Sequence, residues 1–143
     1  MSGFQVKDSG EREEFDTGAR RDTRERKGRY DLLSPVFLKR LALLYENGAE
    51  KYGDHNWEKG MPLSRYLDSA MRHLVCWMDG DRSEDHLVQS AWNAAAYVHT
   101  EQRIREGKLP LELDDINDIW LAVSRGLLTT HMINGKTYIT QET

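Results

Sequence analysis

The sequence is poor in several features that mark large classes of protein. It holds one cysteine, Cys76, among 143 residues, which excludes an internal disulfide framework and is typical of a reducing compartment. No apolar run approaches the roughly 20 residues of a membrane-spanning helix, and the N-terminus lacks the hydrophobic region of a signal peptide. Basic residues are outnumbered, with 20 Lys and Arg against 24 Asp and Glu. We therefore expect a cytoplasmic protein with neither a membrane nor a nucleic-acid polymer as its partner.

Several standard catalytic motifs are also missing. The chain has no glycine-rich phosphate loop ending in Lys-Ser or Lys-Thr, no His-Glu-x-x-His, no cysteine pair for zinc and no Gly-x-Ser-x-Gly. Cys76 lies between Val75 and Trp77, and these apolar neighbours favour a packed side chain over a nucleophile.

Charge is abundant, at 31% of residues, and it is unevenly spread. Residues 1–30 hold 8 basic and 7 acidic side chains and show no helical or alternating apolar pattern. Such a segment buries too little apolar surface to offset its ordering entropy, so we predict a charged flexible arm, largely extended or disordered. Basic residues are dense between Arg20 and Arg29. Two interpretations stay open: a solvated arm, or an arm that folds over a bound anion or a neighbouring subunit.

Helical periodicity dominates residues 31–126, which we predict to form the main domain. Proline residues open the first two helices, and Ser83 is expected to cap the third, with Glu84 and Asp85 in its first turn. The fourth is expected to begin near Asp114 or Asp115. The predicted helices cover roughly residues 35–51, 62–78, 84–106 and 115–126.

Residues 127–143 have a different pattern, that of a small appendage. Asn134-Gly135 supplies the positive φ angles of a type I′ turn, so residues 131–139 predict a hairpin. The expected fold class is all-α: an antiparallel helical bundle with a charged N-terminal arm and a small C-terminal β-hairpin.

Acidic side chains gather near the predicted helix ends. Glu46 and Glu50 are four residues apart, hence on one face of the first helix, and Asp81, Glu84 and Asp85 cluster before the third. Carboxylates from different helices of a bundle can converge on Mg²⁺, which prefers oxygen ligands and bridges phosphates. The competing interpretation is an ordinary solvated face.

Histidine and tryptophan residues offer further candidates. His73 lies on the second predicted helix and His86 on the third, where it shares a face with Asn93; a helical histidine is more often packed than catalytic. Trp57 follows Asn56 in a turn-rich loop, where an indole could stack on a base while the amide reads the edge of that base. The alternative is a tryptophan that closes the end of the bundle.

A series of motifs, in order along the chain, resembles a known family. They are Tyr-Glu-Asn-Gly-Ala-Glu-Lys-Tyr-Gly-Asp-His-Asn-Trp-Glu-Lys-Gly at 45–60, Arg-Tyr-Leu at 65–67, Ser-Ala-Met-Arg-His-Leu at 69–74, Glu-Asp-His-Leu at 84–87 and Ala-Trp-Asn at 91–93. Parts of residues 17–23 and 27–32 match as well. Together these residues resemble the phage-encoded dATP/dGTP diphosphohydrolases, MazG-like proteins sometimes called MazZ, over roughly residues 8 to 115.

The resemblance implies an all-α enzyme that cleaves a purine (deoxy)nucleoside triphosphate between its α and β phosphates. The products are the monophosphate and pyrophosphate, and the cofactor is Mg²⁺ or Mn²⁺. Such enzymes work as homodimers or homotetramers with sites near subunit contacts, in phage nucleotide-pool metabolism and hence in the host cytoplasm. A non-catalytic nucleotide-binding or phage accessory bundle is the alternative, and a helical interaction module whose basic arm grips a partner is a third.

The resemblance also implies roles for individual residues. Glu46 would be the principal metal carboxylate and, with His73, a catalytic residue. The further metal ligands would be Glu50, Asp81 and Asp85. Substrate contacts would come from Lys51 and Arg72 for phosphate, Asn56 and Trp57 for the base, and His86 and Asn93 for the sugar, a water or a ligand. The chain departs from the Glu-x-x-Glu and Glu-x-x-Asp pattern of the wider MazG superfamily, because Ala49 stands three residues after Glu46.

Overall fold

A computed structural model describes residues 8–116 and 118–141. The first seven residues of the predicted arm and the last two of the predicted appendage therefore lie outside the described residues. The chain divides into two compact units, Met1–Ser34 and Pro35–Thr143, and the second contains all the long helices.

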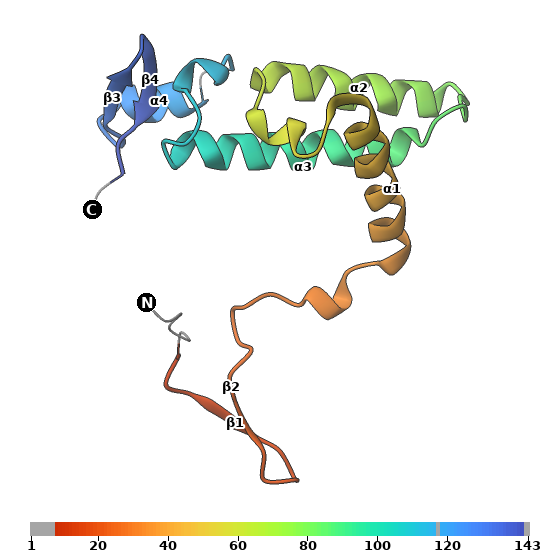
Figure 1. Cartoon of the computed structure of the whole chain (residues 1–143), viewed down its shortest axis with the longest axis vertical. Helices are drawn as coiled ribbons and strands as arrows, with labels where there is room; N and C mark the ends of the chain where they lie inside the picture. The colour runs from red at the N-terminus through yellow and green to blue at the C-terminus, as the bar shows by residue number, and fades with distance from the viewer. Residues whose placement is uncertain (1–7, 117, 142–143) are drawn as a thin grey trace. The chain divides into compact units, whose positions relative to one another are not determined.

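The N-terminal unit contains a short hairpin where the sequence pattern predicts an extended or disordered arm. Strands β1 (Arg12–Glu14) and β2 (Arg20–Asp22) pair antiparallel (Figure 1), and the 3₁₀ turn η1 (Tyr30–Leu32) follows. Arg12 reaches across the strands to Asp22, which also pairs with Lys27. Opposite charges across the strands favour this local pairing. The flexibility of the arm stays a prediction.

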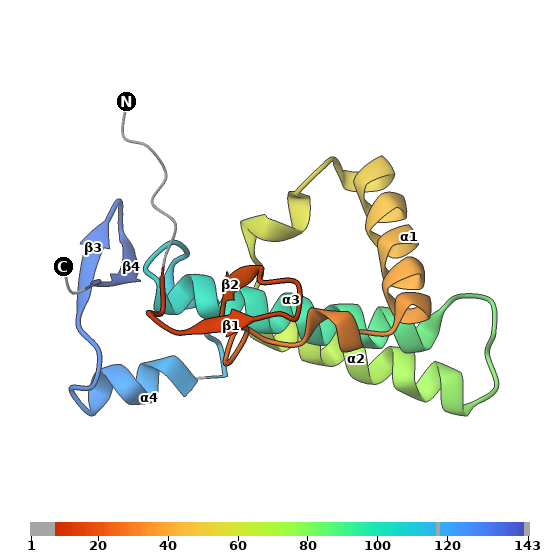
Figure 2. The ribbon, with the colours of Figure 1, turned by 90° about the horizontal axis from the view of Figure 1, so that it is seen from below.

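The second unit is helical, as predicted. Its helices are α1 (Pro35–Tyr52), α2 (Leu63–Met78), α3 (His86–Arg105) and α4 (Asp118–Ser124). Two 3₁₀ turns connect them, η2 (Asn56–Lys59) and η3 (Leu111–Leu113). Helices α2 and α3 lie side by side and antiparallel, and α1 crosses this pair steeply in both views (Figures 1 and 2). The all-α class with a small C-terminal hairpin is confirmed.

The start of α3 differs from the prediction. Ser83 does not cap the helix; its hydroxyl and backbone N–H donate to Asp81 at 2.7 and 2.8 Å. The capping residue is Asp85, whose carboxylate accepts from the Val88 backbone N–H at 3.4 Å. The local Asp81–Ser83 bonds hold this segment in a turn, so the helix begins at His86.

Helix α4 also begins later than predicted. The 3₁₀ turn η3 occupies the preceding residues, and the buried Asp114 accepts hydrogen bonds from the Ile119 and Trp120 backbone N–H groups at 2.6 and 3.1 Å. Asp115 turns instead toward α2, where it accepts from the Ser64 backbone N–H at 2.8 Å. These two carboxylates therefore serve the N-termini of two different helices.

The apolar core lies where α2, α3, η3, α4 and the hairpin meet. Its buried members are Leu63, Tyr66, Ala96, Ile104, Leu111, Ile119 and Ile139. The hairpin pairs β3 (Thr130–Ile133) with β4 (Lys136–Ile139), and positive φ angles of 49° and 75° at Asn134 and Gly135 confirm the predicted turn. Gly107 permits the close approach of this hairpin, because a Cβ there would lie 2.1 Å from the Ile139 carbonyl oxygen.

One face of α2 remains exposed although it is apolar. Its members recur at helical spacing and are Leu67, Met71, Leu74, Val75 and Met78, hereafter the α2 stripe. Met71 and Met78 are 67% and 78% exposed. No helix within the described parts of the chain combines the length and apolar character needed to cross a membrane.

Candidate functional site

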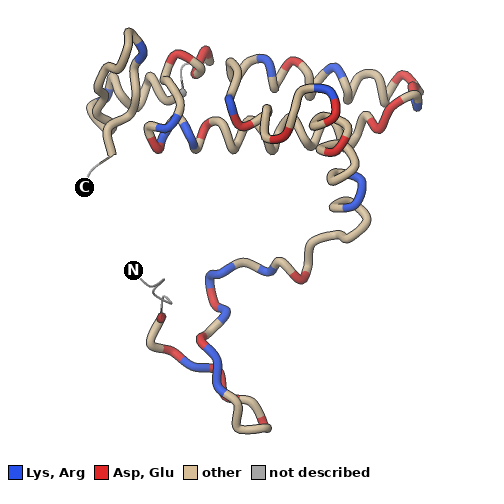
Figure 3. The backbone as a smooth tube through the Cα atoms, viewed as in Figure 1, with Lys and Arg blue, Asp and Glu red and all other residues tan. Residues whose placement is uncertain are grey.

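The connection between α2 and α3 is rich in acidic residues, as Figure 3 shows along the backbone. Two buried histidines flank this connection, His73 on α2 and His86 at the first position of α3, with 5% and 4% of their surfaces exposed. Their Nδ1 atoms lie 2.9 Å apart. One imidazole must donate and the other accept at this distance, so the two rings share a proton.

The environment of His73 favours its neutral form. Burial lowers the pKa of His73, and the positive charges of Arg72 and of a protonated His86 lower it further. A neutral imidazole can accept a proton or bind a metal ion. Arg72 itself is exposed on α2.

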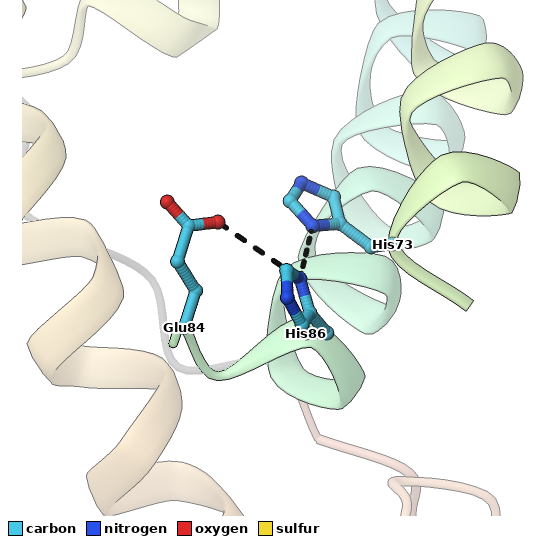
Figure 4. A group of neighbouring side chains, drawn as sticks. All are labelled: His73, Glu84 and His86. Atoms are coloured by element: carbon cyan, nitrogen blue, oxygen red, sulfur yellow. Dashed lines mark hydrogen bonds and ion pairs between the residues drawn. The ribbon is translucent and has the colours of Figure 1, made fainter. Parts of the chain in front are cut away.

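His86 contacts carboxylates through both ring nitrogens. Glu84 Oε2 lies 3.9 Å from its Nδ1 (Figure 4), and Asp81 Oδ2 lies 3.1 Å from its Nε2. The buried Nε2 has no hydrogen-bond partner of ordinary geometry among the described residues, and the Asp81 contact is an ion pair when His86 is protonated. Polar atoms that are buried in this way are uncommon in folded proteins and call for an explanation.

Asp81 and Asp85, two of the predicted metal ligands, already have partners. Hydrogen bonds from Ser83 lower the pKa of Asp81 to about 2. Arg40 on α1 binds both oxygens of Asp85, at 2.7 and 2.5 Å, and lowers its pKa. Both carboxylates therefore stay ionised near neutral pH, with their charge partly satisfied within the chain.

Glu46 and Glu50 are different in this respect. Both are exposed on α1, and neither has a hydrogen-bond or ion-pair partner among the described residues. Glu46 borders a shallow groove together with Lys39, Ala42 and Leu43. Next to Glu50, the exposed Lys51 extends over the ring of Tyr52, 5.7 Å from its centroid.

The loop after α1 places Trp57 in an aromatic cluster. Its ring meets those of Tyr45 and His99 edge to face, with centroids 5.4 and 4.7 Å apart, and the side chain is half-buried, as is that of Asn56. This packing fits a tryptophan that closes the end of the bundle. Contact of Trp57 with a base stays a prediction. Asn93 on α3 is buried, and its amide donates to the Gln89 carbonyl oxygen at 2.9 Å.

The structure thus divides the predicted site residues into groups. In the part of the chain that the structure describes, no three of the predicted carboxylates bring ligand atoms within 4.8 Å of one another. Two mixed groups do so: His73 with Glu84 and His86, and Cys76 with Asp81 and His86. Glu84 belonged to the predicted acidic cluster but was not among the residues assigned to the site. Cys76 was predicted to be a packed side chain. Cys76 is a half-buried thiol.

The fold and these residues define a class: an all-α protein with carboxylates on α1 and a buried histidine pair at the α2–α3 turn. The family model described as dATP/dGTP diphosphohydrolase, N-terminal, matches residues 17–109. The chain belongs to this family.

A relative from Salmonella phage PMBT28, a dATP/dGTP diphosphohydrolase, is 31% identical over 67 residues. The match covers 47% of this chain and 22% of that relative, so the chain spans a minor part of the relative's length. No solved structure matches the chain significantly.

Proposed function

We propose that this chain is a metal-dependent diphosphohydrolase that converts dATP or dGTP to the monophosphate and pyrophosphate. The observation that carries the proposal is the family match, which includes α1, η2, α2 and α3 and hence every predicted site residue. The phage relative is a dATP/dGTP diphosphohydrolase and so belongs to the same reaction class. The pathway we assign is phage nucleotide-pool metabolism in the host cytoplasm.

Glu46 and Glu50 are the residues we assign to Mg²⁺ or Mn²⁺. Their carboxylates are exposed, one turn apart and without partners among the described residues, so the donor set fits a hydrated hard cation. Such an ion, when bound, neutralises phosphate charge and lowers the pKa of water. Asp81 and Asp85 are held by Ser83 and Arg40, so as ligands they would first have to exchange these partners.

The other site residues act on the nucleotide directly. Lys51 and Arg72 carry exposed positive charge and are assigned to the phosphates. Asn56 and Trp57 are assigned to the base. The neutral imidazole of His73, which burial favours, accepts a proton from the attacking water. His86 and Asn93, which are buried, are assigned to the sugar, a water or a ligand.

The α2 stripe supports a homodimer or homotetramer. Its five exposed apolar side chains form a continuous row on one helix face, and a second copy of the chain would cover it. Such association would also bring acidic residues of two chains near one another. An active site at a subunit contact needs this proximity.

The test is release of pyrophosphate from each (deoxy)nucleoside triphosphate in the presence of Mg²⁺ or Mn²⁺, with the monophosphate identified by chromatography. We expect turnover of dATP and dGTP to exceed that of pyrimidine nucleotides and to stop when a chelator removes the metal. Tight nucleotide binding without release of pyrophosphate would overturn the enzymatic assignment and favour a nucleotide-binding module.

A further inference from the structure

The buried pair of histidines has a ligand chemistry that differs from that of the Mg²⁺ carboxylates. We propose that His73, His86 and Glu84 form a site for a transition-metal dication, with Zn²⁺ as its representative. Both imidazoles would bind through Nδ1, and Glu84 would supply a carboxylate oxygen. The site does not depend on nucleotide hydrolysis.

The geometry of the two imidazoles suits a shared ion. When two nitrogens each lie about 2.1 Å from one Zn²⁺ and the N–Zn–N angle is about 90–110°, the nitrogens are roughly 3.0–3.4 Å apart. The observed Nδ1–Nδ1 separation is 2.9 Å, so only a small opening of the pair is needed. An ion would replace the proton that the two nitrogens share.

Glu84 is placed to be the third ligand. Figure 4 shows its carboxylate extended toward the two rings, and all three ligand atoms lie within 4.8 Å of one another. The Glu84 side chain is 54% exposed, and its Oε2 accepts from the Gln89 side-chain amide at 3.0 Å. As a ligand it would exchange this solvent-exposed partner for the ion. Two histidines and one carboxylate are a donor set of zinc sites that keep one coordination position open.

The second nitrogen of His86 provides an independent observation. It is buried and has no hydrogen-bond partner in the described parts of the chain, yet Asp81 Oδ2 is 3.1 Å away. A histidine that binds metal through one nitrogen usually donates its other N–H to a carboxylate, which fixes the tautomer. Metal at Nδ1 would place the proton on Nε2, where a small rotation of Asp81 completes the hydrogen bond.

The nitrogen ligands determine the class of ion. Imidazole suits zinc and its neighbours in the first transition row, whereas Mg²⁺ takes oxygen ligands and retains its waters. The site is therefore expected to hold Zn²⁺ or Co²⁺ in the presence of excess Mg²⁺. His73 is also the base assigned in the proposed function, so an ion bound at its Nδ1 would compete with that role. Metal binding in the absence of nucleotide is therefore the appropriate measurement.

The experiment is a Zn²⁺ titration of the full chain after treatment with a chelator, followed by calorimetry and by competition with a chromogenic chelator. Co²⁺ absorption reports the coordination geometry. We expect one ion per chain, retained in millimolar Mg²⁺. Glu84→Gln should weaken binding at least about tenfold, His73→Gln and His86→Gln should abolish it, and Asp81→Asn should weaken it about 10- to 100-fold as an outer-shell partner.

His131→Gln is the matched control, because His131 is exposed on the β3–β4 hairpin; it should bind Zn²⁺ like the parent chain. Glu84 is exposed, so its variant separates loss of a ligand from loss of folding, which circular dichroism monitors for the histidine variants. Wild-type affinity in Glu84→Gln would overturn the proposal. So would loss of binding in Cys76→Ser, since it would place the ion at the other nitrogen of His86.

Discussion

Arg40 and Asp85 join α1 to the first turn of α3. The guanidinium Nε lies 2.7 Å from one carboxylate oxygen and Nη2 lies 2.5 Å from the other, while the same carboxylate caps the helix at Val88. Asp85 precedes His86 directly, and Glu46 is on the same helix as Arg40. This ion pair therefore links the helix that carries Glu46 to the residue next to the histidine pair, and the ring contact between Tyr45 and Trp92 joins the same two helices.

Loss of this pair should lower the stability of the chain. We expect Asp85→Ala to reduce the free energy of unfolding by about 1–2 kcal/mol, because it removes a helix cap together with the ion pair. Arg40→Ala removes only the ion pair, whose side chains are partly exposed to solvent, and should therefore cost less. Urea denaturation of both single variants and the double variant gives the coupling energy. If the losses of stability in the two single variants add up to the loss in the double variant, the two side chains are not coupled and the prediction is wrong.

The same coupling should depend on pH in a definite direction. Arg40 holds the pKa of Asp85 below its ordinary value, so the pair contributes stability that is fully present above the unfolded-state pKa of roughly 3.9. The contribution is lost as the pH falls through the lower, folded-state pKa. Double-mutant cycles at neutral pH and at roughly pH 3 measure this change. A coupling energy between Arg40 and Asp85 that is larger at roughly pH 3 than at neutral pH would contradict this prediction.

Glu46→Gln tests the assigned metal carboxylate. We expect pyrophosphate release to fall roughly 100-fold or more, equivalent to about 3 kcal/mol of transition-state stabilisation, because the amide cannot replace an anionic ligand. Glu112→Gln is the control: Glu112 lies beyond the residues matched by the family and accepts from the Thr137 backbone N–H, which glutamine can also do. Undiminished activity in Glu46→Gln would remove this residue from the site.

Gly107→Ala should destabilise the chain more than Gly126→Ala. Both glycines have positive φ, 67° and 70°, so both substitutions strain the backbone by about 1 kcal/mol. Only at Gly107 does the added Cβ meet an atom, the Ile139 carbonyl oxygen at 2.1 Å. We expect a further loss of about 2 kcal/mol or more there, measured by chemical denaturation. Equal losses would mean that the hairpin does not contact this end of α3.

Met71→Glu tests whether the α2 stripe is a contact between copies of the chain. A charge in the centre of this stripe should shift the chain from dimer or tetramer to monomer, since burial of an unpaired charge opposes association. Light scattering coupled to size exclusion gives the mass. Met132→Glu, at a 70% exposed position on β3, should leave the mass unchanged. An assembly that persists in Met71→Glu would place the interface elsewhere.

Local signals predicted most of the fold. Proline at the start of the first two helices, glycine after their ends and Asn134-Gly135 in the tail each act within a few residues. Helices α1 and α2 and the hairpin appear where these residues indicate. The errors at α3 and α4 have one cause. Several acidic and hydroxyl residues were available as caps, and the choice among them depends on tertiary partners, such as Arg40 for Asp85.

The candidate site was less accessible to prediction, because its residues meet across turns. His73 and His86 are 13 positions apart, and their contact requires the α2–α3 pairing. Glu84 was assigned to a helix and proved to lie in the turn, where its carboxylate faces the histidines. The roles of Glu46 and Glu50 stay predictions, since they concern groups that bind to the chain rather than contacts within it.

The small core has a thermodynamic consequence. Burial of apolar surface is the main favourable contribution to folding, and this chain leaves the α2 stripe outside its own interior. In a homo-oligomer, the same surface would stabilise both the folded chain and the assembly. Folding and association would then be one linked equilibrium, so the melting temperature would rise with protein concentration and dilution would favour unfolding.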